Sequence, residues 1–151
     1  MLESLLVTIH VIANLIWIGS IVSVGVLLST ATPENAQSYG LAARKIYLSI
    51  ATPAFGISFL FGIARLSMSA STYMHLHWFH AKLTFALAVI ALHHVIGAKA
   101  KRAAESQMTS SKNDAPRSMH SSKSSAILTS ALIACASLAV VFVVFQSQLV
   151  P

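Results

Sequence analysis

Apolar residues run through most of this chain in long stretches, separated by three polar or charged connections. A helix rises about 1.5 Å per residue, so about 20 apolar residues are needed to cross a bilayer. Four stretches meet this length, at about residues 5–29, 46–66, 78–96 and 126–145. The pattern predicts an all-α fold, a four-helix bundle that spans a lipid bilayer as a single domain over residues 1–151.

The composition supports this interpretation. Only 9% of the 151 residues are charged and 56% are hydrophobic, whereas about a quarter of a soluble domain is charged. The first apolar stretch follows Glu3 and no Lys or Arg, and it exceeds the length of about 7–15 residues found in signal peptides, so we expect a retained helix. Cys135 is the one cysteine, which excludes an internal disulfide and a Cys-x-x-Cys-His haem attachment.

Basic residues predict the topology. The first connection carries Arg44 and Lys45, and the second has only Arg65 at its edge. The third connection holds most of the positive charge: Lys99, Lys101, Arg102, Lys112, Arg117 and Lys123. The positive-inside rule then places the first and third loops in the cytoplasm and both termini outside. The net charge of +6 belongs mainly to a flexible cytoplasmic loop at about 99–125, so it indicates the bilayer and no nucleic acid.

Two histidines lie inside predicted spans at similar depth, His10 in the first and His80 near the start of the third. An ionisable side chain in hydrocarbon needs a partner and indicates a functional site. Haem iron is commonly held by histidines of neighbouring helices. We therefore predict that His10 and His80 ligate one b-type haem near the outer face. Interhelical hydrogen bonds or proton relay are the alternative roles for these histidines.

Helical spacing assigns faces to these residues. One face of the first helix would carry His10, Asn14, Trp17 and Ile21. On the third helix His80 and His94 share a face, whereas His93 points in nearly the opposite direction. His94 is accordingly the fallback ligand. The second and fourth spans contain no histidine, so the pattern allows one haem and not two.

Three stretches carry a family resemblance. They are "IHVIANLIWIG" with His10 and Trp17, "ARKIYLSIATPAFGISFLFG" with Tyr47, Thr52, Pro53, Ala54, Phe61 and Gly62, and "WFHAKLTFALAVIALHHVIG" with Trp78, His80, Lys82, His93, His94 and Gly97. They resemble the HemJ family of bacterial membrane protoporphyrinogen oxidases and the wider set of CopD-like four-helix membrane proteins. The resemblance covers nearly all of the helical part of the chain.

The resemblance implies a function and a place. It implies a bacterial inner-membrane protein that holds haem b by helix histidines, with Trp17, Tyr47 and Trp78 among the cofactor contacts. It implies oxidation of protoporphyrinogen IX to protoporphyrin IX, with electrons passed to the membrane electron-transport chain and quinone as a candidate acceptor. Lys82 and Arg65 approach the outer interface, where they could pair with a porphyrin carboxylate or serve as interfacial anchors.

Other functions stay open. The connection "ARLSMSASTYMHLHWFH" gathers Met68, Met74, His75, His77 and His80, and thioether with imidazole suits copper, as in a CopD-like copper-handling protein. The HemJ family has a Pro-Arg pair where this chain has Gly25 and Val26, and an Asn-Glu-x-Pro motif where it has "SSKSSAILTS". A non-catalytic haem or structural subunit of a larger membrane complex, or a homo-oligomer, is therefore a further alternative.

Overall fold

The computed structural model describes residues 1–68, 70–110 and 119–144 of the chain. In chain order its elements are α1 (Leu2–Thr30), α2 (Ala36–Ile46), the π-helical turn η1 (Tyr47–Ala51), α3 (Thr52–Ser67), α4 (Ala70–Met74), α5 (His77–Ser110) and α6 (Met119–Val144). Over these ranges the chain forms helices and turns and no strand, which confirms the all-α prediction.

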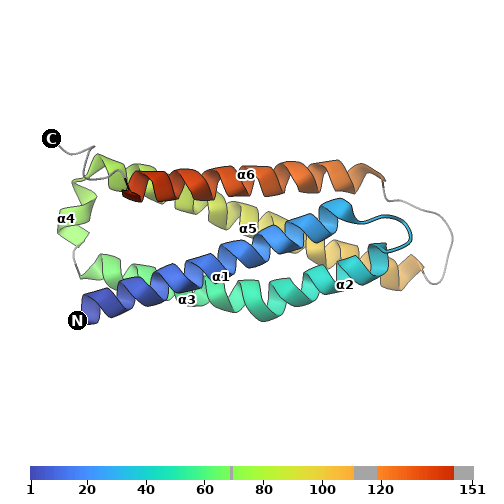
Figure 1. Cartoon of the computed structure of the whole chain (residues 1–151), viewed down its shortest axis with the longest axis horizontal. Helices are drawn as coiled ribbons and strands as arrows, with labels where there is room; N and C mark the ends of the chain where they lie inside the picture. The colour runs from blue at the N-terminus through green and yellow to red at the C-terminus, as the bar shows by residue number, and fades with distance from the viewer. Residues whose placement is uncertain (69, 111–118, 145–151) are drawn as a thin grey trace.

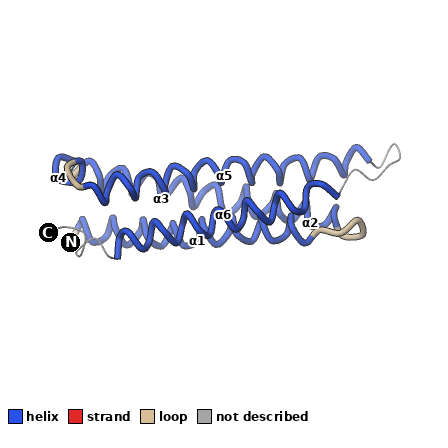
Figure 2. The backbone as a smooth tube through the Cα atoms, turned by 90° about the horizontal axis from the view of Figure 1, so that it is seen from above, coloured by secondary structure: helices blue, strands red, loops and turns tan. Residues whose placement is uncertain are grey.

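Four long rods make up the bundle, because α2, η1 and α3 follow one another without a break. Figure 1 shows α6 along the top, α1 rising toward it from the lower left, and α5 descending from the upper left to end beside α2. Figure 2 places α1 and α6 in one layer and α3 and α5 in the other. The packing agrees, since α1 packs on α3 and α6 whereas α5 packs on α6 and α2.

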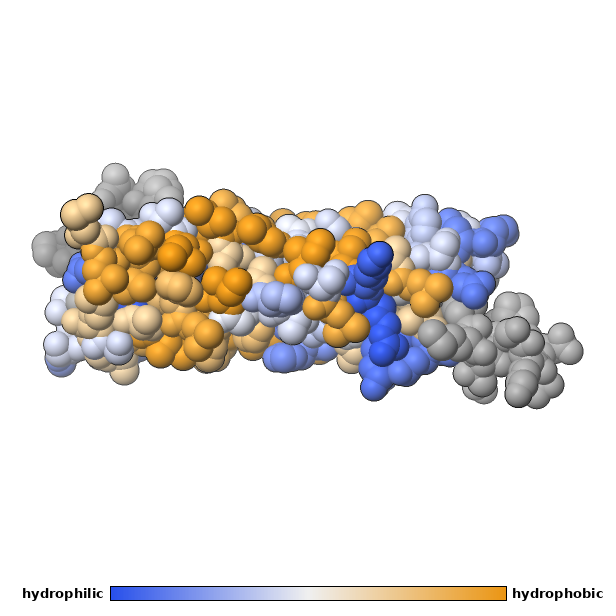
Figure 3. Space-filling model, turned by 90° about the horizontal axis from the view of Figure 1, so that it is seen from below, coloured by the Kyte–Doolittle hydropathy of each residue, from blue (hydrophilic) through white to orange (hydrophobic). Residues whose placement is uncertain are grey.

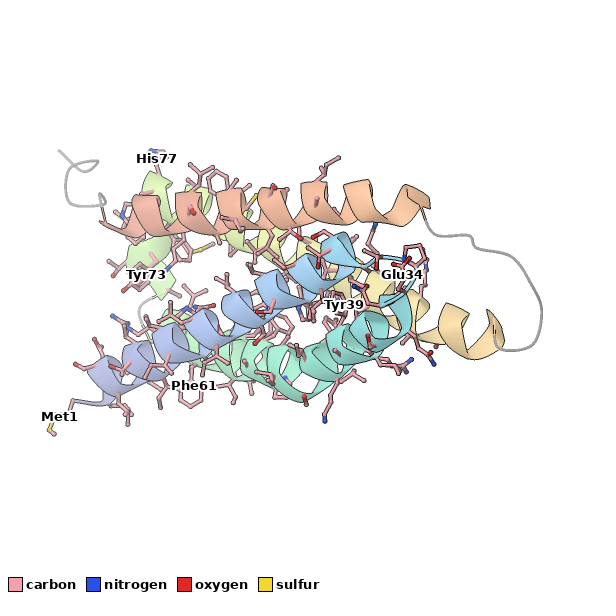
Figure 4. All side chains as sticks on the ribbon, turned by 45° about the vertical axis from the view of Figure 1, so that its right-hand side comes forward. Met1, Glu34, Tyr39, Phe61, Tyr73 and His77 are labelled. Carbon is pink, nitrogen blue, oxygen red and sulfur yellow. The ribbon has the colours of Figure 1, made fainter. Side chains whose placement is uncertain are left out.

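The two ends of the bundle differ, and we name them by the short helices beside them. The α4 end contains the start of α1, the end of α3 and the start of α5. Figure 4 marks this end with Met1, Tyr73 and His77, whereas Glu34 lies at the opposite end. The opposite end, called the α2 end, contains the turn between α1 and α2.

Three helical segments are long and apolar enough to cross a membrane: Leu2–Thr30, Ala36–Ser67 and His77–Glu105. The apolar part of α6 that the structure describes, Ala126–Leu138, is shorter, so the fourth span stays a prediction. Figure 3 shows apolar side chains over much of the face seen from below, with hydrophilic ones crossing it toward the α2 end. The chain is a multi-pass, all-α membrane protein.

Two predicted boundaries change. The second rod begins at Ala36 and not near residue 46. Residues 99–110 and 119–125, predicted as parts of a flexible loop, belong instead to α5 and α6, and residues 111–118 lie outside the described ranges. The physical reason is packing: Ala100 and Ala104 of α5 are fully buried, as is Ala43 of α2. Because basic residues surround these alanines in the sequence, the pattern did not predict a helix face of small residues here.

Pro53 is accommodated by a change of hydrogen-bond pattern. Proline has no N–H and cannot donate to a carbonyl of the preceding turn. Just before it, the N–H of Thr52 donates to the carbonyl of Tyr47, five residues earlier, and Thr52 Oγ1 donates to the same carbonyl at 2.9 Å. This π-helical turn begins at Tyr47, a residue that proves central to the site described below. Such turns are frequent at functional sites.

Small residues set the closest helix crossings. Gly25 of α1 lies against the side chain of Thr129 of α6. At Gly40 of α2, a Cβ atom would lie 3.0 Å from the carbonyl oxygen of Ala103 in α5. Small residues let helix backbones approach closely in membranes, where packing takes over much of the role of the hydrophobic effect.

Gly25→Val should therefore lower the free energy of unfolding in detergent by about 1–3 kcal/mol, because the new side chain would overlap Thr129. Gly19→Val is the matched control on the same helix, since no heavy atom lies within 4 Å of its added Cβ. Both changes carry the same helix-propensity difference. Equal melting temperatures for the two variants would contradict the close α1–α6 crossing.

Candidate functional site

The first polar group inside the bundle centres on His10 of α1. Its Nδ1 lies 2.7 Å from the carbonyl oxygen of Ser58 in α3, and the Nδ2 amide of Asn14 lies 2.9 Å from its Nε2. A carbonyl only accepts, so Nδ1 carries the proton and donates, and Nε2 accepts from Asn14. Ser58 Oγ donates to Asn14 Oδ1 at 2.8 Å, which completes a cluster that we call the His10 cluster.

Gly62 makes room for this imidazole. It lies one turn after Ser58 on α3, and a Cβ atom there would lie 2.9 Å from His10 Cε1. Ser58 is 2% exposed, so the α1–α3 contact is closed around the hydroxyl. The ring of His10 is held between a backbone carbonyl, an amide and a glycine, which fixes its tautomer and orientation.

The second polar group centres on His93 of α5, which is 1% exposed. Trp17 Nε1 donates to His93 Nδ1 at 3.1 Å, and Tyr47 Oη lies 3.2 Å from His93 Nε2. Indole N–H can only donate, so Nδ1 bears no proton, the ring is neutral, and Nε2–H donates to the tyrosine oxygen. One imidazole thus joins α1, η1 and α5.

Aromatic rings enclose His93, and we call these residues the His93 cage. The Tyr47 ring stacks on the imidazole at a centroid distance of 4.9 Å and 27°, and Phe55 lies at 5.0 Å and 33°. Trp17 meets the ring edge-on at 5.7 Å and 76°. Gly97 of α5 lies directly beneath the Tyr47 ring, and a Cβ atom there would overlap it.

Both groups lie on one face of α1. His10 and Trp17 are seven residues apart, which returns to nearly the same side of a helix about 10 Å further along. Trp17 and Ile21 are buried and His10 and Asn14 are partly buried, so the predicted inward face of α1 is confirmed. Phe55 also contacts Trp17, with centroids 4.9 Å apart.

The inward face of α5 differs from the predicted one. His80 and His94 are both exposed, and His93 is the buried histidine of this helix. The predicted haem ligand His80 and the fallback ligand His94 therefore lie off the buried face of α5, and His93 lies on it. The buried positions of α5 follow helical spacing through Val89, His93, Ile96, Gly97, Ala100 and Ala104. His80 Nε2 instead lies 2.9 Å from the Met74 carbonyl oxygen at the α4 end.

Lys82 and Arg65 take different positions. Lys82 is half-buried on α5, close enough to His10 for its charge to act on the ring. Arg65 Nη2 lies 3.3 Å from Glu3 Oε2, and its guanidinium lies over the Tyr73 ring at 5.5 Å. Arg65 thus ties the end of α3 to the start of α1. Of the two cations, Lys82 is the one whose charge acts on His10.

The histidines at the α4 end were a predicted metal site. Among the side chains that the structure describes, in residues 1–68, 70–105 and 126–138, there is no group of three or more His, Cys, Asp or Glu that could hold a metal ion. Trp78 packs edge-on against Tyr73, with centroids 6.2 Å apart, as an interfacial aromatic pair. The copper-binding alternative stays a prediction.

Comparison with known proteins brought no match: no protein-family model, no curated protein and no solved structure matches this chain. In the structure the predicted contacts Trp17 and Tyr47 meet at His93, and the predicted ligand His10 lies with Asn14 and Ser58.

The sequence analysis did not find the His93 cage. The signal was present, because Val89, Ile96 and Ala100 follow His93 at helical spacing and mark the buried face of α5. The prediction for α5 followed the spacing of His80 and His94 instead of this apolar periodicity. Ser58 was also missed as a partner of His10, because a contact between residues 48 positions apart leaves no local pattern.

Removing the indole donor tests the cage. Trp17→Phe should lower the free energy of unfolding by about 1–3 kcal/mol, because it leaves His93 Nδ1 buried without a partner. Trp78→Phe is the matched control at an interface, with an expected change within about 0.5 kcal/mol. In Trp17→Phe/His93→Leu the loss should be smaller than the sum of the single losses. Additive losses in thermal unfolding would contradict the hydrogen bond.

Proposed function

We propose that this protein binds haem b in the membrane through His10 and oxidises protoporphyrinogen IX to protoporphyrin IX. The observation that carries the proposal is the His10 cluster. A metal-ligating histidine commonly donates one ring N–H to a backbone carbonyl and keeps the other nitrogen's lone pair for the metal. His10 has this arrangement, with Nδ1–H on the Ser58 carbonyl and a lone pair on Nε2.

The residues around His10 fit such a cofactor on the α1 side. Asn14 is the one side chain on Nε2, and it would have to turn away for ligation. Lys82 supplies a cation near the ring, which suits the carboxylate of a porphyrin propionate. The nitrogens of His93 are both used by Trp17 and Tyr47, so we assign His93 to the structure of the bundle and not to iron.

The proposed chemistry divides between cofactor and protein. When bound, haem supplies one-electron transfer, and this reactivity is its own. The porphyrinogen loses six electrons and six protons in all, and three membrane quinones would take them up, two of each per quinone, to become quinols. The part of Lys82 is to hold a substrate carboxylate, and that of the bundle is to exclude water and orient the macrocycle. The resemblance to the HemJ family supports this choice of substrate.

The basic residues at the α2 end support an orientation. Arg44, Lys45, Lys101 and Arg102 gather there, whereas Glu3 and Arg65 pair at the α4 end. By the positive-inside rule the α2 end then faces the cytoplasm of a bacterium and the haem site lies toward the outer face of its inner membrane. The start of α1, at the α4 end, is then outside.

Absorption spectra test the cofactor. The detergent-purified protein should show a Soret band that shifts on reduction with dithionite, and His10→Ala should lose it because the iron loses its α1 ligand. His93→Phe should retain the band. Loss of a six-coordinate low-spin spectrum in His80→Ala would assign His80 as a second ligand, and retention would exclude His80. An unchanged Soret band in His10→Ala would overturn the assignment.

Complementation tests the reaction. Expression of the protein should restore growth of a bacterial strain without protoporphyrinogen oxidase, and Lys82→Met should reduce rescue at least about tenfold, since one charged contact is worth about 1.5–3 kcal/mol. Lys45→Met, an exposed cation at the opposite end, should rescue normally.

Failure to rescue with normal haem binding would identify a haem-binding subunit without this activity. Failure together with stoichiometric copper and no Soret band would favour copper handling.

A further inference from the structure

A pocket of about 190 Å³ lies at the α2 end, between the α2–η1 junction and α5. Its lining residues come from two helices: Arg44, Tyr47, Leu48, Gly97, Ala98 and Lys101. The pocket is separate from the His10 cluster, and nothing in the proposed haem chemistry uses it. Its walls combine apolar side chains with two cations, which is the combination that an amphipathic anion needs.

The pocket opens on the outer surface of a segment that is long and apolar enough to span a membrane. Leu48 at its rim is 55% exposed within a membrane-spanning segment, and Ala98 on the opposite wall is exposed too. Gly97 forms the floor of the pocket, and its lack of a side chain lets the Tyr47 ring lie across that position. A ligand could therefore enter from the bilayer with its chains against Leu48 and its head group between the helices.

The charges at the pocket do not cancel. Arg44 lies 3.5 Å and Lys101 lies 3.9 Å from Glu105 Oε1, so two cations share one carboxylate oxygen. Both distances exceed the range of about 2.7–2.9 Å that is typical of charge-assisted hydrogen bonds. The Arg44 side chain is 35% exposed and keeps guanidinium N–H groups for a further acceptor. Lys45 and Arg102, next in sequence, add positive charge around the same end.

We propose that this pocket binds the phosphate head group of an anionic phospholipid. Arg44 and Lys101 would hold the phosphate from α2 and α5, and the apolar rim at Leu48 and Ala98 would hold the first part of the acyl chains. Basic pockets between membrane helices are suited to anionic head groups for this reason. The site is independent of haem, so its test does not depend on the proposed function.

The charge pattern supplies a matched pair of variants. Arg44→Gln/Lys101→Gln removes the two cations that line the pocket. Lys45→Gln/Arg102→Gln also removes one Arg and one Lys, one from α2 and one from α5, at adjacent exposed positions. The two double variants therefore have the same net charge and differ only in where the charge is lost.

Native mass spectrometry of the full chain in mixed micelles measures the binding of phosphatidylglycerol and of phosphatidylcholine with the same acyl chains. The unchanged protein should prefer phosphatidylglycerol by about tenfold. Arg44→Gln/Lys101→Gln should lose that preference, and Lys45→Gln/Arg102→Gln should keep most of it. Glu105→Gln should bind phosphatidylglycerol more tightly, because it removes the competing carboxylate.

Other outcomes overturn the proposal. Equal losses in the two double variants would mean attraction by the general surface charge and no site. Equal binding of the two lipids would mean apolar contact alone. Inorganic phosphate that competes at the same concentration as the lipid would indicate a simple anion site, and displacement by a short-chain quinone would indicate a neutral head group. Ala98→Phe, which fills the pocket without a change of charge, should weaken lipid binding in a protein whose melting temperature is retained.

Discussion

The structure depends on the need to satisfy polar groups where no water reaches. In hydrocarbon an unpaired imidazole or indole N–H has no solvent to bond with, so its partners must come from neighbouring helices. His93 shows this most clearly, because Trp17 and Tyr47 occupy both of its nitrogens from α1 and from η1. Three elements are thereby fixed in rotation and in depth relative to one another. Apolar contacts alone, which slide easily, would not fix this register.

The imidazoles of His93 and His10 differ in how accessible they are to a ligand. His93 is buried, neutral and enclosed by rings, so any ligand would have to break a hydrogen bond and displace an aromatic side chain. His10 is partly buried, and the group on its Nε2 is the amide of Asn14, a short side chain one turn away on the same helix. The geometry makes His10 the more accessible of the two imidazoles. Lys82 adds a charge to this accessible side and none to the cage.

Much of this arrangement could be predicted from the sequence, and the exceptions have physical causes. The all-α membrane fold follows from the length of the apolar segments, and the inward face of α1 follows from their 3.6-residue periodicity. Both were confirmed. The buried face of α5 was not predicted, because the prediction followed the spacing of His80 and His94 and not the apolar and small residues that share a face with His93. The length of α5 was underestimated because Lys99, Lys101 and Arg102 look like a loop, whereas Ala100 and Ala104 between and after them pack on α2. The contact of Ser58 with His10 joins distant parts of the chain and has no sequence signature.

Tyr47 connects the interior of the bundle to its charged end. Its ring stacks on His93 and its backbone begins the π-helical turn, while the same side chain lines the pocket between Arg44 and Lys101. A change in the position of this one ring would alter both the hydrogen bond to His93 and the shape of the pocket. Because Gly97 leaves no side chain between them, the ring lies directly on the α5 backbone. A ligand in the pocket would therefore contact the same aromatic side chain that stacks on His93.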